Sequence, residues 1–263
     1  MDYNETKNMK KRSQITWVPP AYFAMGLPFV VLNMVTVLMF KGLNVEDKLI
    51  TFWTSLILLP WTLKPLWSPF LELFKTKKFF VTLTQLVTVI PFGLVACSLN
   101  LPHFFSSSIA LLAVIAFSGA THDIVCDGVY MSELSASEQA KYIGWQGAFY
   151  NIAKIVATGG LVYLAGTLIE RYSGGATDSE TLLAANQKAW MIIMAILCVV
   201  MVLLGIYHRF MLPSGEQKKN KAERRSAKEV MPELGNVLLD FFRKSLIVYY
   251  QFFIILYRYA EGF

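Results

Sequence analysis

Long apolar segments alternate with short polar segments along most of the chain. A helix needs about 20 mostly apolar residues to cross the hydrocarbon core of a bilayer, and a window of that length predicts six spans. A seventh apolar segment begins near Leu246 and continues to Phe263. The six predicted spans are residues 17–40, 49–66, 79–99, 104–130, 142–169 and 189–212.

These spans predict an all-α polytopic membrane helix bundle, with six transmembrane helices plus a truncated seventh. We expect a tail at 1–16, a six-helix bundle at 17–212, a basic linker at 213–244 and an incomplete second bundle from 245 to 263. The alternative for the linker is an amphipathic helix lying on anionic lipid. Because the seventh segment ends inside an apolar run, the chain is expected to be a fragment of a longer protein.

Composition and charge agree with burial in lipid. The hydrophobic set makes up 55% of the chain and charged residues only 16%, whereas a soluble domain carries about 25% charged residues. The net charge of +6 comes from basic residues at helix ends and in connecting segments, which excludes a nucleic-acid-binding patch. The excess of Lys and Arg in the tail, in the loop after the second span and in the linker predicts a cytoplasmic N-terminus.

Cysteine and acidic residues give no sign of a metal or a cofactor. Cys97, Cys126 and Cys198 lie inside apolar segments, without the spacing of metal ligands, and are expected to be small core residues. No cofactor is expected.

Two aspartates, Asp123 and Asp127, lie in the fourth predicted span. A carboxylate in the middle of a membrane helix costs about 2.5 to 3.5 kcal/mol on insertion scales, so such residues usually face a bundle interior. At i and i+4 the two side chains share one helix face. We expect them to carry protons, with Lys154 of the fifth span as their counter-charge; the alternative is a purely structural ion pair. An unperturbed imidazole titrates near neutral pH, so His122 is either a proton relay or a hydrogen-bonded helix partner.

Four sequence blocks carry a family resemblance. They read AMGLP at 24–28, KPLWSP at 64–69, ATHDIVCDG at 120–128 and LYRYAEGF at 256–263. In this order and spacing they resemble the AmpG-type muropeptide permeases of the major facilitator superfamily, to which acetyl-CoA transporters are similar. The resemblance implies a multi-pass permease of the bacterial inner membrane that imports peptidoglycan fragments together with protons. Such carriers need two halves around a central site, so the missing C-terminal half is required for transport.

The resemblance also implies a set of substrate-binding residues. Asn151 stands where family members often have a basic residue, and Lys154 is on roughly the same helix face. Arg258 is expected to bind a carboxylate or phosphate of the substrate bidentately, and Glu261 to gate it. The alternative is that Arg258 and Glu261 pair with each other at i and i+3.

A second set of charged residues lies around the connection between the second and third spans. Glu72, Lys75 and Lys64 are expected to form a charge latch for conformational switching, or, for the two lysines, to act as topology signals. The glycines of the first and fifth spans are expected to permit close helix packing. They are Gly26, Gly144, Gly147, Gly159 and Gly160.

Three other functions remain open at this point. One is a carrier for another anionic metabolite, such as an acyl-CoA or a sugar conjugate. Another is a non-transporting receptor or assembly subunit. The third is a Mg²⁺-dependent membrane transferase, but such an enzyme needs a second acidic cluster and the spans contain none. We therefore do not expect an enzyme.

Overall fold

The computed structural model describes residues 13–68, 70–71 and 76–215, and a few positions between 243 and 256. The chain divides into two compact units, one of Met1–Leu71 with Lys75–Gln217, the other of Glu72–Phe74 with Lys218–Phe263. The helices discussed below all belong to the first unit. Most of the predicted linker and of the predicted seventh span lies outside the described residues.

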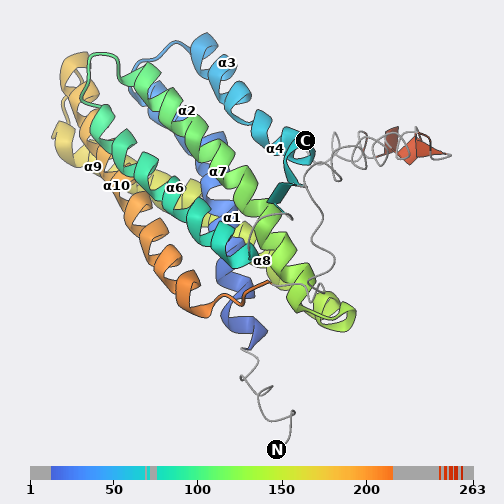
Figure 1. Ribbon diagram of the computed structural model, residues 1–263. Helices are drawn as coiled ribbons and strands as arrows, with labels where there is room; N and C mark the ends of the chain where they lie inside the picture. The colour runs from blue at the N-terminus through green and yellow to red at the C-terminus, as the bar shows by residue number, and fades with distance from the viewer. Residues whose placement is uncertain are drawn as a thin grey trace, which may run out of the picture. The chain divides into compact units, whose positions relative to one another are not determined.

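The described part of the first unit is all-helical, and six of its segments are long and apolar enough to cross a membrane (Figure 1). All six predicted spans are therefore confirmed as candidate membrane helices, and length and composition make the chain a multi-pass membrane protein. The six segments are Gln14–Gly42, Asp47–Leu66, Lys77–Ser98, Phe104–Glu133, Ala136–Ser173 and Ser179–Met211.

Three of these segments are single helices, and three are interrupted. The single helices are α6 (Lys77–Ser98), α7 (Phe104–Glu133) and α10 (Ser179–Met211). The first segment contains η2 (Gln14–Thr16), α1 (Val18–Val30), the π turn η3 (Val31–Val35) and α2 (Thr36–Gly42). The second contains α3 (Asp47–Ile57), α4 (Leu59–Leu63) and the 3₁₀ turn η4 (Lys64–Leu66). The fifth contains α8 (Ala136–Ile155), the π turn η5 (Val156–Leu161) and α9 (Val162–Ser173).

The two π turns have local causes in the sequence. Pro28 lies inside α1, just before η3, and its missing N–H disturbs the regular hydrogen-bond ladder. Gly159 and Gly160 lie within η5, where their weak helix preference lowers the cost of a wider turn. The turns η3 and η5 pack against each other, so the first and fifth segments are irregular at the same place.

Two helices begin earlier than the hydropathy pattern predicts. Helix α8 begins at Ala136 because Ser135 and Glu138 form a capping box, in which each side chain accepts from the other residue's backbone N–H. Helix α10 begins at Ser179, where Asp178 Oδ1 accepts a 2.8 Å hydrogen bond from the N–H of Thr181. The same bond lowers the pKa of the Asp178 carboxyl below its usual value, since it stabilises the charged form. These first turns are too polar for a hydropathy window to detect.

Helix α7 lies between two groups of helices. It packs against α6 on one side and against α1, α3 and α4 on the other, while α1 also packs against α8 and α6 against α10 (Figure 1). The main apolar core joins these helices, with Phe40, Phe92, Leu112, Ile115 and Met194 fully buried. Polar residues of α7 therefore meet different partners according to the side on which they project.

The predicted glycine packing is confirmed at Gly26, whereas at the other four glycines no described residue packs closely. A Cβ at Gly26 would lie 3.1 Å from Tyr150 Cδ2 and 3.2 Å from Ala153 Cβ, so its absence lets α1 and α8 approach closely. The other four glycines of this set have nothing within 4 Å of an added Cβ. A side chain at these positions would meet no described residue, so nothing described requires them to be small. They are Gly144, Gly147, Gly159 and Gly160.

We expect Gly26→Ala to lower the free energy of unfolding by about 1 to 3 kcal/mol, the usual cost of overpacking. The matched control is Gly144→Ala, where the added methyl meets no described atom and better helix propensity is worth up to about 1 kcal/mol. Thermal unfolding of the detergent-solubilised protein measures both. Equal stability of the two variants would contradict the close approach of α1 and α8.

Candidate functional site

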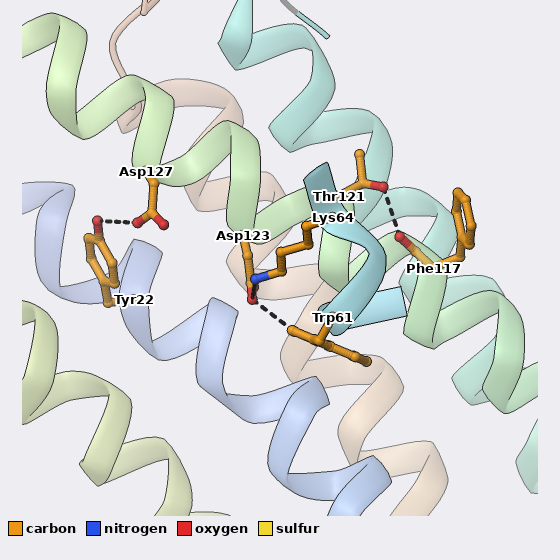
Figure 2. Close-up of polar contacts among 7 residues, drawn as sticks. All are labelled: Tyr22, Trp61, Lys64, Phe117, Thr121, Asp123 and Asp127. Atoms are coloured by element: carbon orange, nitrogen blue, oxygen red, sulfur yellow. Dashed lines mark hydrogen bonds and ion pairs between the residues drawn. The ribbon is translucent and has the colours of Figure 1, made fainter. Parts of the chain in front are cut away.

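Asp123 is a buried carboxylate in the middle of the described bundle. Its Oδ2 accepts a 2.7 Å hydrogen bond from Lys64 Nζ and a 2.8 Å hydrogen bond from Trp61 Nε1 (Figure 2). The side chain of Asp123 is 10% exposed and that of Lys64 is 28% exposed, so the ion pair is largely removed from solvent. The other oxygen, Oδ1, is buried and has no hydrogen-bond partner among the described residues.

The second segment is interrupted after α3, and this interruption places both donors, Lys64 and Trp61, beside Asp123. Helix α3 ends at Ile57, and the short helix α4 and the turn η4 follow, with a proline near the start of each. Trp61 and Lys64 are thus three residues apart on one side of the chain. A Cβ at Gly119 would lie 3.0 Å from Trp61 Cζ2, so Gly119 of α7 leaves room for the indole ring. Phe29 packs edge-on against the same ring, with centroids 5.1 Å apart.

The predicted counter-charge was wrong. Lys154 is exposed and forms no ion pair with any residue that the structure describes, whereas Lys64 occupies the position beside Asp123. The physical reason is that α1 packs against both α7 and α8, and so lies beside the face of α7 where Lys154 was expected. Lys64 was expected to take part in a charge latch with Glu72 and Lys75, or to act as a topology signal. The feature of the sequence that could have indicated a buried Lys64 is its position inside the last turn of the second predicted span.

Asp127 has its own donor, one helical turn away from Asp123. Tyr22 of α1 donates a 2.7 Å hydrogen bond from its hydroxyl to Asp127 Oδ1 (Figure 2). The same hydroxyl accepts a 2.8 Å hydrogen bond from Gln146 Nε2 of α8. Tyr22 is buried, but Asp127 is exposed in the described unit. Two consecutive hydrogen bonds therefore connect α8, α1 and α7, and they end at the accessible carboxylate of Asp127.

His122 projects to the other side of α7, away from both aspartate contacts. It is buried, and its Nδ1 lies 3.1 Å from Thr84 Oγ1 of α6. The Thr84 hydroxyl donates to the carbonyls of Phe80 and Val81, so the bond to His122 requires Nδ1 to carry the proton. This geometry favours the prediction that His122 is a hydrogen-bonded helix partner. Its role as a proton relay remains a prediction.

A second buried histidine, His208 of α10, continues this polar contact across α6. Its Nδ1 accepts from Gln85 Nε2 at 2.5 Å, and the ring is fully buried. Nothing in the sequence singles out His208, which stands beside Arg209 near the end of an apolar span. Both imidazoles thus bind consecutive residues of α6, which ties α7 and α10 to that helix.

The remaining predicted site residues are either exposed or outside the described residues. Asn151 is exposed on α8, and its Nδ2 donates to the Gly147 carbonyl of its own helix at 2.9 Å. Lys154 is exposed one turn further along the same helix. Glu72, Lys75, Arg258 and Glu261 lie outside the described residues, so their predicted roles stay predictions.

The site is suited to exchanging a proton or holding an ion by charge. It offers one carboxylate paired with an ammonium group and a second, accessible carboxylate held by a phenol. Within the described residues no group of three or more His, Cys, Asp or Glu side chains is placed to hold a metal ion.

No protein-family model, curated protein or solved structure matches this chain.

Proposed function

We propose that this chain is the N-terminal half of a secondary transporter of the major facilitator type, which imports an anionic solute together with protons. The observation that carries the proposal is the ion pair between Asp123 and Lys64 inside a candidate membrane bundle, 2.7 Å between Oδ2 and Nζ. Ionisable residues inside membrane segments are expensive and usually mark ion or substrate pathways.

Protonation of Asp123 gives the ion pair two states. The charged carboxylate holds both Lys64 and Trp61 through Oδ2, which leaves Oδ1 without a donor among the described residues and ready to accept a proton. A proton on Oδ1 removes the negative charge, so Lys64 loses its counter-charge and is released toward another anion. Loss of the proton reverses the step. A buried pair that separates on protonation is a physical means of coupling proton movement to a change of conformation.

The proposed solute-facing surface is the exposed polar side of α7 and α8. Asp127 of α7 and the α8 residues Asn151 and Lys154 are exposed, although all three belong to candidate membrane segments. Exposed polar side chains within membrane spans are better explained by a water-filled cavity than by lipid. The family resemblance points to muropeptides as substrates, with Arg258 and Glu261 contributed by the second half, in an inner membrane with a cytoplasmic N-terminus.

Uptake of a labelled anhydro-muropeptide into vesicles containing the full-length protein tests this proposal. We expect accumulation that needs an inward proton gradient and disappears when an uncoupler is added. A labelled acyl-CoA in parallel vesicles distinguishes the alternative solute class. Accumulation that an uncoupler leaves unchanged would contradict proton coupling, and saturable binding without uptake would instead support a receptor or assembly subunit.

A further inference from the structure

A chain of two hydrogen bonds connects Gln146 of α8 to Asp127 of α7 through the hydroxyl of Tyr22. The Gln146 Nε2 donates to the phenol oxygen at 2.8 Å, and the phenol donates to Asp127 Oδ1 at 2.7 Å. A phenol has a single hydrogen, so only one of its two neighbours can accept it. A charged carboxylate can only accept, so the phenol hydrogen points to Asp127 and the amide presents its nitrogen. The charge on Asp127 therefore fixes the direction of the whole chain.

Packing fixes the phenol in place and leaves the amide able to turn. Tyr22 is 5% exposed, and its ring packs edge-on against Tyr130 with centroids 5.9 Å apart. One turn further along each helix, a Cβ at Gly26 would lie 3.1 Å from Tyr150 Cδ2, so α1 and α8 are held close together. Gln146 is half-buried, and its Oε1 has no hydrogen-bond partner among the described residues. Half a turn of the amide exchanges Nε2 and Oε1 without breaking any other described hydrogen bond.

A proton on Asp127 changes which end of the chain is the stronger acceptor. A carboxylate accepts a hydrogen bond more strongly than an amide oxygen does, because its bonds are charge-assisted. The carbonyl of a neutral carboxylic acid is a weaker acceptor than an amide oxygen, and the acid O–H is a strong donor. The phenol hydrogen then goes to the amide oxygen of Gln146, and Oδ1–H of Asp127 donates to the phenol oxygen. Hydrogen bonds in a chain polarise one another, so the two bonds reverse together.

We propose that Gln146 is the positioning residue for the proton of Asp127, and that its amide turns over when Asp127 is protonated, so that the chain reverses direction. The inference rests on the proposed proton carriage by Asp127, and not on which solute is carried. The Oδ1–H bond is the one covalent bond that forms; Tyr22 and Gln146 keep their own hydrogens and rotate. Helix α8, which also carries Asn151 and Lys154 of the proposed solute-facing surface, thereby responds to the charge of a carboxylate on α7.

Other titratable groups surround the chain on each of the elements near it. They set the pH at which Asp127 takes up its proton, whereas the direction of the chain depends on the phenol and the amide. The groups are Asp123, Cys126 and Tyr130 of α7, Lys64 of η4, Lys77 of α6 beside Gly128, and Tyr142 and Tyr150 of α8.

Infrared difference spectra of the full-length protein in lipid, recorded as the pH is lowered, test both steps. A carbon isotope on the side-chain carbonyl of glutamine separates its amide band from the backbone. We expect a new carboxylic-acid band that is lost in Asp127→Asn, together with a shift of the labelled amide band that is lost in Gln146→Met. Tyr22→Phe should keep the carboxylic-acid band and lose the amide shift, because it removes the hydroxyl and leaves the packed ring in place.

Tyr163→Phe is the matched control, since it removes the hydroxyl of a 78% exposed tyrosine of α9 and should change neither band. A carboxylic-acid band from Asp127 without an amide shift would overturn the inference and leave the proposed proton carriage intact. An amide shift that survives in Tyr22→Phe would do the same, because the phenol would not transmit it. Absence of a carboxylic-acid band from Asp127 over the pH range of uptake would instead remove the proposed proton carriage, and the inference with it.

Discussion

Replacing Lys64 by methionine is expected to lower the free energy of unfolding by about 3 kcal/mol, the lower end of the range for removing one partner of a buried ion pair. The lower end applies because the Lys64 side chain is 28% exposed and so is partly solvated. Methionine keeps the apolar stem, so the change removes mainly the charge. Asp123 would then keep only the Trp61 N–H as a donor. Denaturant or thermal unfolding in detergent measures the loss.

The double variant Lys64→Met with Asp123→Asn provides the control for this prediction. It removes both charges, so most of the lost stability should return, because no unpaired charge is left in the interior. A double variant as unstable as Lys64→Met alone would mean that the lysine acts through packing, and that the ion pair contributes little.

Asp127→Asn is expected to abolish proton-driven accumulation while changing the free energy of unfolding by no more than about 0.5 kcal/mol. Asparagine keeps an oxygen that accepts from the Tyr22 hydroxyl, but it cannot bind and release a proton. The effect on stability is small because Asp127 is exposed in the described unit. Vesicle uptake and an unfolding curve on the same preparation separate function from stability.

Asp178→Asn is the matched control for Asp127→Asn. Asp178 is an exposed aspartate that caps α10 outside the candidate spans, and asparagine caps a helix about as well as aspartate. This variant should accumulate substrate normally. Normal accumulation in Asp127→Asn as well would make Asp127 a structural partner of Tyr22 and would remove it from the proton pathway.

The helical spans could be predicted because hydropathy is a local property of the sequence. Each span needs enough apolar residues in a row, and this requirement does not depend on where its neighbours pack. The helix ends at Ser135 and Asp178 could not be found in that way, since capping hydrogen bonds there extend polar turns beyond the apolar run. The same turns can be recognised by their capping residues when these are sought directly.

The candidate site could be predicted only in part. The spacing of Asp123 and Asp127 indicates a shared side of one helix, which is again a local property. Their partners depend on which helices surround α7, and that is decided by tertiary packing. Lys64 therefore replaced Lys154 as the counter-charge, and Tyr22 was not selected at all, because a tyrosine among apolar residues gives no distinctive signal.

The paired turns η3 and η5 give the first and fifth segments a place where each helix can rotate. A π turn holds one residue more than a regular turn, and shifting that residue along the helix rotates the adjoining stretch by roughly 100°. Tyr22 and Gln146 both precede their π turn in the chain, and they are hydrogen-bonded to each other. Rotation of α1 and α8 together would carry this phenol–amide pair away from Asp127 while α2 and α9 stay in place. The protein would then free Asp127 from its phenol donor by twisting two half-helices, without moving a whole domain.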